Sequence, residues 1–183
     1  MKLIFDLVAT QPNLNSKFHG GSEYTKSLLK TLLENKDREK IIGIYDPRKI
    51  LHEEIERYIE KYEMELTPVR NNKEVSEILY KEKPDIFYSG LPYNYQNLKK
   101  PKSTKFIFTI HGLREIEIFE DGNMEGMLLH TKKEKTMNFI KKIVKRTIFF
   151  RKINKVIIGK YHKVISSADT IITVSDFSKY SLL

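Results

Sequence analysis

The amino-acid sequence predicts an α/β domain in which a mainly parallel sheet of six or seven strands is covered by helices on both faces. Short apolar segments alternate along the chain with segments whose apolar residues recur at helical spacing. The apolar segments lack the alternation of apolar and polar residues that a strand with one face in water shows. Together these patterns are typical of a Rossmann-like, three-layer α/β/α fold.

Six segments are predicted to be strands, and the pattern leaves room for a seventh. The pair Asp46–Pro47 ends the second of them, because proline lacks the amide hydrogen that a strand donates to its neighbour. The six segments cover residues 2–8, 41–45, 65–69, 85–89, 105–110 and 170–174.

Helices are predicted between the first strands. Ser22 has the side chain of an N-cap, so we expect the first helix to begin there. Apolar residues at helical spacing place the second helix over about 51–62 and a third around 75–79. The third must end before Pro84, because proline excludes the helical conformation from the residue before it.

The second half of the chain is predicted to be mostly helical before its last strand. A long helical segment is expected from about residue 128 to 166, with a break near Gly159, and Ser175 is expected to begin another helix. No internal repeat or low-complexity linker divides the chain. We therefore expect a single domain over residues 1–183.

Composition excludes several functional classes. The chain has no cysteine, which rules out disulfides, thiol catalysis and thiolate metal sites and agrees with a reducing cytoplasm. The apolar N-terminal segment is short and carries Asp6, unlike a signal peptide. No apolar run approaches the roughly 20 residues that span a bilayer. We expect a cytoplasmic protein, with peripheral attachment to the inner face of the membrane as an open alternative.

The positive charge of the chain is concentrated in one segment. The formal net charge is +9, yet residues 131–163 contain twelve Lys or Arg and a single acidic residue, Glu134. The rest of the chain is close to neutral. This distribution indicates a local basic patch rather than a basic surface all round.

The basic segment is predicted to form an amphipathic helix, and two interpretations of it remain open. Its charged face is either the solvated side of a helix that covers the sheet, or a surface that contacts anionic lipid headgroups. The segment lacks the patterns of nucleic-acid-binding motifs, so no nucleic-acid partner is expected. The expected membrane-contact residues are Lys141, Lys142, Lys145, Arg146 and Lys152.

Gly20 and Gly21 follow the first strand and precede the first helix. Glycines at such a position let the backbone approach an anionic group, and the free amides of a helix N-terminus favour phosphate. The pattern has neither the Lys-Ser/Thr pair of a P-loop nor the third glycine of a dinucleotide fingerprint. The alternative is a turn that requires a positive φ.

His111 follows the apolar strand 105–110 and should therefore emerge at the carboxyl edge of the sheet. There it would contact a sugar hydroxyl or a phosphate, or it would hold a loop through its ring. The other histidines lack both this setting and the paired spacing of metal ligands, so no metal is expected.

Three segments taken together resemble the N-terminal domain of GT-B glycosyltransferases of the retaining "group 1", family 4-like class, which use nucleotide-sugar donors. Gly20–Gly21 matches the glycine loop after the first strand, and Thr109–His111 matches the strand-end histidine segment. Residues Ile171–Ser178, which include Ser175, match the signature at the junction of strand and helix. The resemblance covers essentially the whole chain.

The resemblance implies an acceptor-binding half whose partner, a C-terminal nucleotide-sugar-binding domain, is absent from this chain. It places Gly20, Gly21 and Ser175 near the donor phosphates or the acceptor, and His111 facing the transferred sugar. The implied reaction is metal-free sugar transfer with retention, to a glycan or lipid-linked acceptor of cell-surface polysaccharide or glycolipid synthesis. Residues 1–183 alone are then expected to be inactive.

Two other functions remain open. The chain could be a catalytically inert Rossmann-like binding or scaffold domain with a basic, membrane-facing helix. It could also be an unrelated Rossmann-like ligand-binding protein with a basic surface, which thermal stabilisation by a dinucleotide would favour.

Overall fold

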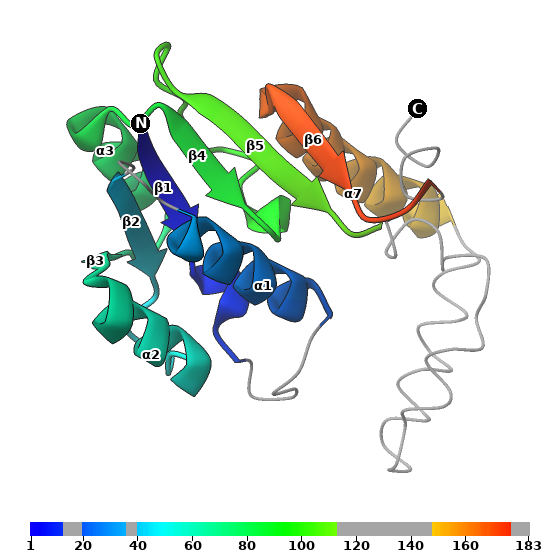
Figure 1. Ribbon diagram of the computed structural model, residues 1–183. Coiled ribbons are helices and arrows are strands. Elements are labelled where there is room, and N and C mark those ends of the chain that lie inside the picture. Colours follow the sequence, from blue (N-terminus) through cyan, green and yellow to red (C-terminus); the bar gives the residue numbers. More distant parts are fainter. Residues whose placement is uncertain (13–19, 36–39, 113–147, 177–183) are drawn as a thin grey trace, which may run out of the picture.

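A computed structural model of the chain describes residues 1–12, 20–35, 40–112 and 148–176. Across these residues six strands form one sheet in the spatial order β3-β2-β1-β4-β5-β6 (Figure 1), and every neighbouring pair is parallel. The predicted fold class is confirmed. The strands are β1 (Lys2–Asp6), β2 (Lys40–Tyr45), β3 (Glu65–Pro68), β4 (Ile86–Ser89), β5 (Lys105–Ile110) and β6 (Thr170–Thr173).

Helices cover both faces of this sheet (Figure 1). On one face Leu29 and Ile55, from two different helices, pack with Phe5 of β1. On the other face Leu79 and Val164 pack with Phe87 and Phe106 of the central strands. The first pair of helices is α1 (Gly20–Glu34) and α2 (Glu53–Tyr62), and the second is α3 (Asn72–Glu82) and α7 (Ile148–Ser167).

Burial on both faces explains why the strands have continuous apolar sequences. In β1, Leu3 and Phe5 face α1 and α2, while Ile4 belongs to the core beneath α3 and α7. All three are at most 4% exposed. Burying such side chains stabilises the fold by about 1.5–3 kcal/mol each.

The ends of α3 agree with the sequence prediction. Asn71 caps its N-terminus, accepting hydrogen bonds from the amides of Lys73 and Glu74, both at 3.0 Å. The helix stops at Lys83, whose left-handed φ of 45° ends it one residue before Pro84. The predicted end of this helix is confirmed.

Two local predictions are wrong. Helix α1 begins at Gly20 rather than Ser22, and the Ser22 hydroxyl donates to the Thr10 carbonyl at 3.2 Å instead of capping the helix. Helix α7 runs without a break through Gly159, where an added Cβ would meet nothing within 4 Å. The earlier part of the long predicted helix, before Ile148, lies outside the described residues.

The strand order reverses between β1 and β4. The chain runs outward from β1 to β2 and β3, then returns to the other side of β1 to build β4, β5 and β6. In open parallel sheets, ligands bind in the crevice outside the carboxyl ends of the strands at such a switch point. The two strands that flank this switch point are each followed by a short 3-10 helix. These are η1 (Val8–Thr10), after β1, and η2 (Pro92–Asn94), after β4.

Candidate functional site

Gly21 and His111, two residues singled out from the sequence, lie against each other at this switch point. A Cβ added to Gly21 would stand 3.2 Å from Cδ2 and from Nε2 of His111, and 2.7 Å from Cδ2 of Leu91. One turn further along α1, Tyr24 packs its ring edge-on against the His111 imidazole, with ring centroids 5.3 Å apart. The first turn of α1 therefore packs directly on the end of β5.

The backbone conformation excludes one of the two interpretations of the glycines, the turn that requires a positive φ. Gly112 has a positive φ, of 150°, whereas Gly20 and Gly21 are part of helix α1. Gly21 is thus needed for close approach to Leu91 and His111 rather than for a turn. Gly20 is exposed, and a Cβ there would meet nothing within 4 Å.

Ser175 lies beyond the same edge of the sheet. Thr173 of β6 pairs with Ile110 of β5, so the residues that follow the two strands leave the sheet at one level. Ser175 is exposed. The structure thus brings Gly21 and His111 into contact and places Ser175 after the neighbouring strand.

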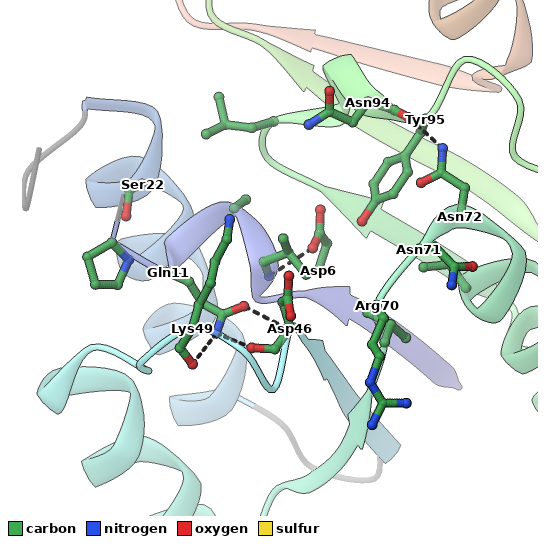
Figure 2. Close-up of a pocket in the computed structure, with 16 residues that line it drawn as sticks. Asp6, Gln11, Ser22, Asp46, Lys49, Arg70, Asn71, Asn72, Asn94 and Tyr95 are labelled. Atoms are coloured by element: carbon green, nitrogen blue, oxygen red, sulfur yellow. Dashed lines mark hydrogen bonds between the residues drawn. The ribbon is translucent and has the colours of Figure 1, made fainter. Parts of the chain in front are cut away.

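A second feature of this edge is a cavity of about 380 Å³ at the carboxyl ends of β1, β2, β3 and β4 (Figure 2). It adjoins the Gly21–His111 pair, because Leu91, which contacts Gly21, is also one of its walls. Polar and apolar surface contribute almost equally to its lining. The polar residues of its lining, labelled in Figure 2, are Asp6, Gln11, Ser22, Asp46, Lys49, Arg70, Asn71, Asn72, Asn94 and Tyr95.

Asp6, at the end of β1, is a buried carboxyl group at the base of the cavity. It is 2% exposed, and it accepts hydrogen bonds from the Ser89 hydroxyl at 2.6 Å and the Val8 amide at 2.9 Å. Burial raises the pKa of Asp6 from 3.8 to about 6, although the hydrogen bonds from Ser89 and Tyr95 oppose that rise. Asp6 joins β1 to β4 across the switch point.

The pKa of Asp46, at the end of β2, is shifted in the opposite direction. The Arg48 side chain donates to both of its carboxylate oxygens, from Nε at 2.9 Å and from Nη2 at 2.8 Å. These hydrogen bonds lower the pKa of Asp46 to about 2. Arg48 also donates to the Arg70 carbonyl at 3.0 Å, so it joins the ends of β2 and β3.

Gln11 fixes the turn that follows β2. Its amide oxygen accepts from the Asp46 backbone amide at 2.7 Å, and its Nε2 donates to the carbonyls of Asp46 at 2.9 Å and Lys49 at 3.1 Å. The Lys49 side chain extends into the cavity, whereas the Arg70 guanidinium points away from Asp6 (Figure 2). Because the Arg48 guanidinium compensates the negative charge of the Asp46 carboxylate, the Lys49 ammonium group adds positive charge to the cavity.

Sequence reasoning missed most of this cavity and one further glycine. Gly90 lies so close to α1 that a Cβ there would stand 1.9 Å from Oγ1 of Thr25. Asp6, a lone carboxylate inside an apolar strand, and Gly90, directly after a strand, were visible signals. No signal in the sequence indicates the contribution of Gln11, because its hydrogen-bond partners lie at least 35 residues away in the chain.

The expected membrane-contact residues are almost all outside the described part of the chain. Lys141, Lys142, Lys145 and Arg146 fall there, and Lys152 lies in α7. Of the helices in the described ranges, none combines the length and apolar character needed to cross a membrane. The same ranges contain no group of three or more carboxylate or imidazole side chains suited to a metal ion.

Comparison with known proteins identifies no relative. The chain matches no protein-family model, no curated protein and no solved structure.

Proposed function

We propose that this chain is the acceptor-binding lobe of a retaining, nucleotide-sugar-dependent glycosyltransferase of the GT-B type. The proposed acceptor is a glycan or lipid-linked sugar of cell-surface polysaccharide or glycolipid synthesis. One observation carries the proposal: the contact of Gly21 with His111 at the switch point of a parallel sheet, beside a cavity lined by both polar and apolar groups. Two of the three motifs that resemble this enzyme class thus come from distant segments and meet at one place.

The cavity has the chemistry of a sugar site. The ammonium group of Lys49 and the side-chain amide of Asn94 are suited to hydroxyl or anionic groups, while Val69 and Leu91 offer apolar surface to the C–H faces of a sugar ring. A volume of about 380 Å³ falls in the range of ordinary small-molecule sites. In the proposal this cavity seats the acceptor.

In the proposal, His111 and the start of α1 lie at the side of this cavity where the sugar is transferred. In the proposal the imidazole of His111, whose ring packs on Gly21, faces the transferred sugar. The N-terminus of α1, which begins at Gly20, suits a departing diphosphate because the helix dipole is positive at that end. Holding the acceptor in register with the donor would supply rate by proximity.

The dinucleotide alternative is weakened by the arrangement around Asp46. In dinucleotide-binding sheets an acidic residue that follows the second strand accepts hydrogen bonds from a ribose. Asp46 has that position, but Arg48 occupies both of its carboxylate oxygens. Each oxygen therefore keeps fewer lone pairs for a ribose hydroxyl.

A ligand panel tests the proposal. Thermal unfolding is recorded with short oligosaccharides, polyprenyl-phosphate-linked sugars, nucleotide sugars and NAD. A sugar acceptor is expected to raise the melting temperature more than NAD does, because binding to the folded state stabilises it. His111→Ala should largely abolish that rise, whereas His162→Ala, an exposed histidine on α7, should leave it intact.

Two outcomes would contradict the proposal. Stabilisation by NAD alone would favour the dinucleotide-binding protein, and no stabilisation by any sugar would favour the inert scaffold. The chain by itself is expected to give no turnover with nucleotide sugars, because it is proposed to hold only the acceptor. Measured transfer by residues 1–183 alone would overturn its assignment as a single lobe.

We also propose that the basic segment 131–163 binds an anionic membrane surface peripherally, which would bring the lobe to lipid-linked acceptors. Its concentrated positive charge supports this. Sedimentation with phosphatidylserine vesicles should show binding that weakens with salt and with the pair Lys141→Glu and Lys145→Glu. The matched pair Lys73→Glu and Lys81→Glu, on the exposed side of α3, should bind normally. Binding that ignores both salt and lipid charge would contradict this model.

A further inference from the structure

The hydroxyl group of Tyr93 connects two consecutive backbone groups at the end of β5. It accepts a hydrogen bond from the His111 amide at 3.2 Å and donates one to the Gly112 carbonyl at 3.2 Å. Tyr93 belongs to η2, the short helix that follows β4. Tyr93 follows β4, and its side chain therefore holds the end of the neighbouring strand, β5.

These two hydrogen bonds act at and beside Gly112, where the absence of a side chain leaves the backbone little restricted. Gly112 has a φ of 150°, a conformation that side-chain-bearing residues rarely adopt. A glycine at this position gives the chain freedom to turn, and with it freedom to displace His111. The Tyr93 hydroxyl removes part of that freedom by binding one group on each of the two residues.

Tyr93 is itself supported from the opposite layer. Its ring packs edge-on against Tyr161 of α7, with centroids 5.6 Å apart and an interplanar angle of 73°. The His111 ring is held on its own side by Tyr24 and by the close approach of Gly21. His111 is thus fixed through its backbone by Tyr93 and through its ring by α1.

We propose that Tyr93 is a positioning residue for His111. By holding the backbone of residues 111 and 112, it keeps the imidazole against Gly21 and Tyr24. The importance of this orientation for transfer rests on the proposed function. The orientation itself is a property of the folded chain and is measurable without a substrate.

Nuclear magnetic resonance of the Tyr93→Phe variant tests the proposal. This substitution removes the hydroxyl and keeps the ring that packs on Tyr161. Nuclear Overhauser contacts from the His111 ring protons to Gly21 and Tyr24 should weaken, and exchange of the His111 amide should accelerate about fivefold. The matched control is Tyr80→Phe, which removes a hydroxyl bonded to the Lys100 carbonyl at 3.4 Å on an exposed surface.

The ring contacts separate positioning from a purely structural effect, since a general loss of stability would not selectively alter the orientation of one imidazole. Unchanged His111 ring contacts in a folded Tyr93→Phe protein would overturn the proposal. If Tyr93→Phe does not fold, Tyr161→Leu decides the matter: it removes the support of the Tyr93 ring and should weaken the same contacts to a smaller extent. Unchanged contacts there would equally overturn it.

Sugar binding distinguishes the failure of the two proposals. If the ring contacts weaken in Tyr93→Phe and glycan stabilisation falls with them, both proposals are supported. If the contacts weaken while wild-type protein is stabilised by no glycan, positioning by Tyr93 stands and the proposed function fails.

Discussion

The two halves of the carboxyl edge are built by different means. Beyond β1, β2 and β3, polar side chains hold one another by short hydrogen bonds and leave a cavity, with Asp6, Gln11 and Asp46 each fixed by partners. Beyond β4 and β5, glycines and rings pack in contact, as at Gly21, Gly90 and His111. The first half leaves space for a ligand, and the second holds one imidazole at its border.

This difference predicts how each half responds to substitution. In the packed half, added volume should be destabilising because there is no space to receive it. In the hydrogen-bonded half, loss of a polar group should be destabilising because its buried partners are left without bonds.

The largest effect is expected for Gly90→Ala. Its methyl group would stand 1.9 Å from Oγ1 of Thr25, so α1 must move away from β4. Unfolding by urea should show a loss of more than about 3 kcal/mol in the free energy of unfolding. Adding Thr25→Ala should restore part of the loss, because it removes the nearest atom.

Gly159→Ala is the matched control for that substitution. An added Cβ at this position in α7 meets nothing within 4 Å, so a helix propensity gain of up to about 1 kcal/mol is expected. A Gly90→Ala protein as stable as wild type would contradict the tight packing of α1 on β4.

The pH dependence of stability should reveal Asp6. Its folded pKa of about 6 lies above the ordinary value of 3.8, so between these pH values the folded protein binds more protons than the unfolded one. Stability should therefore fall by about 3 kcal/mol as the pH rises from about 4 to above 6. Asp6→Asn should remove this decline in urea titrations across that range. An equal decline in Asp6→Asn would show that another group causes it.

A smaller effect is expected for Gln11→Ala. The buried Gln11 amide makes three hydrogen bonds to the backbone of Asp46 and Lys49, and their loss should lower stability by about 2 kcal/mol. Asn35→Ala, which removes an exposed amide bonded to the Thr31 carbonyl, should change stability by less than about 0.5 kcal/mol. Equal effects of the two substitutions would mean that Gln11 does not hold the turn after β2.

The strands were predictable from sequence because each apolar segment is buried on both faces, as the packing around Leu3, Ile4 and Phe5 shows. The end of α3 was predictable because Pro84 acts locally. In contrast, Ser22 has the residue type of a cap, but its hydroxyl is directed to Thr10 by the fold of η1.

The candidate site was predictable only in part. His111 and Gly21 could be assigned to the carboxyl edge, because their places after predicted strands fix that edge. Their direct contact, and the need for glycine that it creates, depend on how α1 packs against β5. The cavity depends on residues from four strand ends, and no local pattern relates Gln11 to Asp46.

The central claim is that the Gly21–His111 pair and the adjoining cavity form one sugar-binding site. Amide chemical-shift mapping with short oligosaccharides tests it most directly. We expect shifts at Ser22, Leu91 and His111, around the switch point, and none at Asp85 on the amino edge of the sheet. Saturable shifts located elsewhere, or none with any oligosaccharide, would contradict the claim.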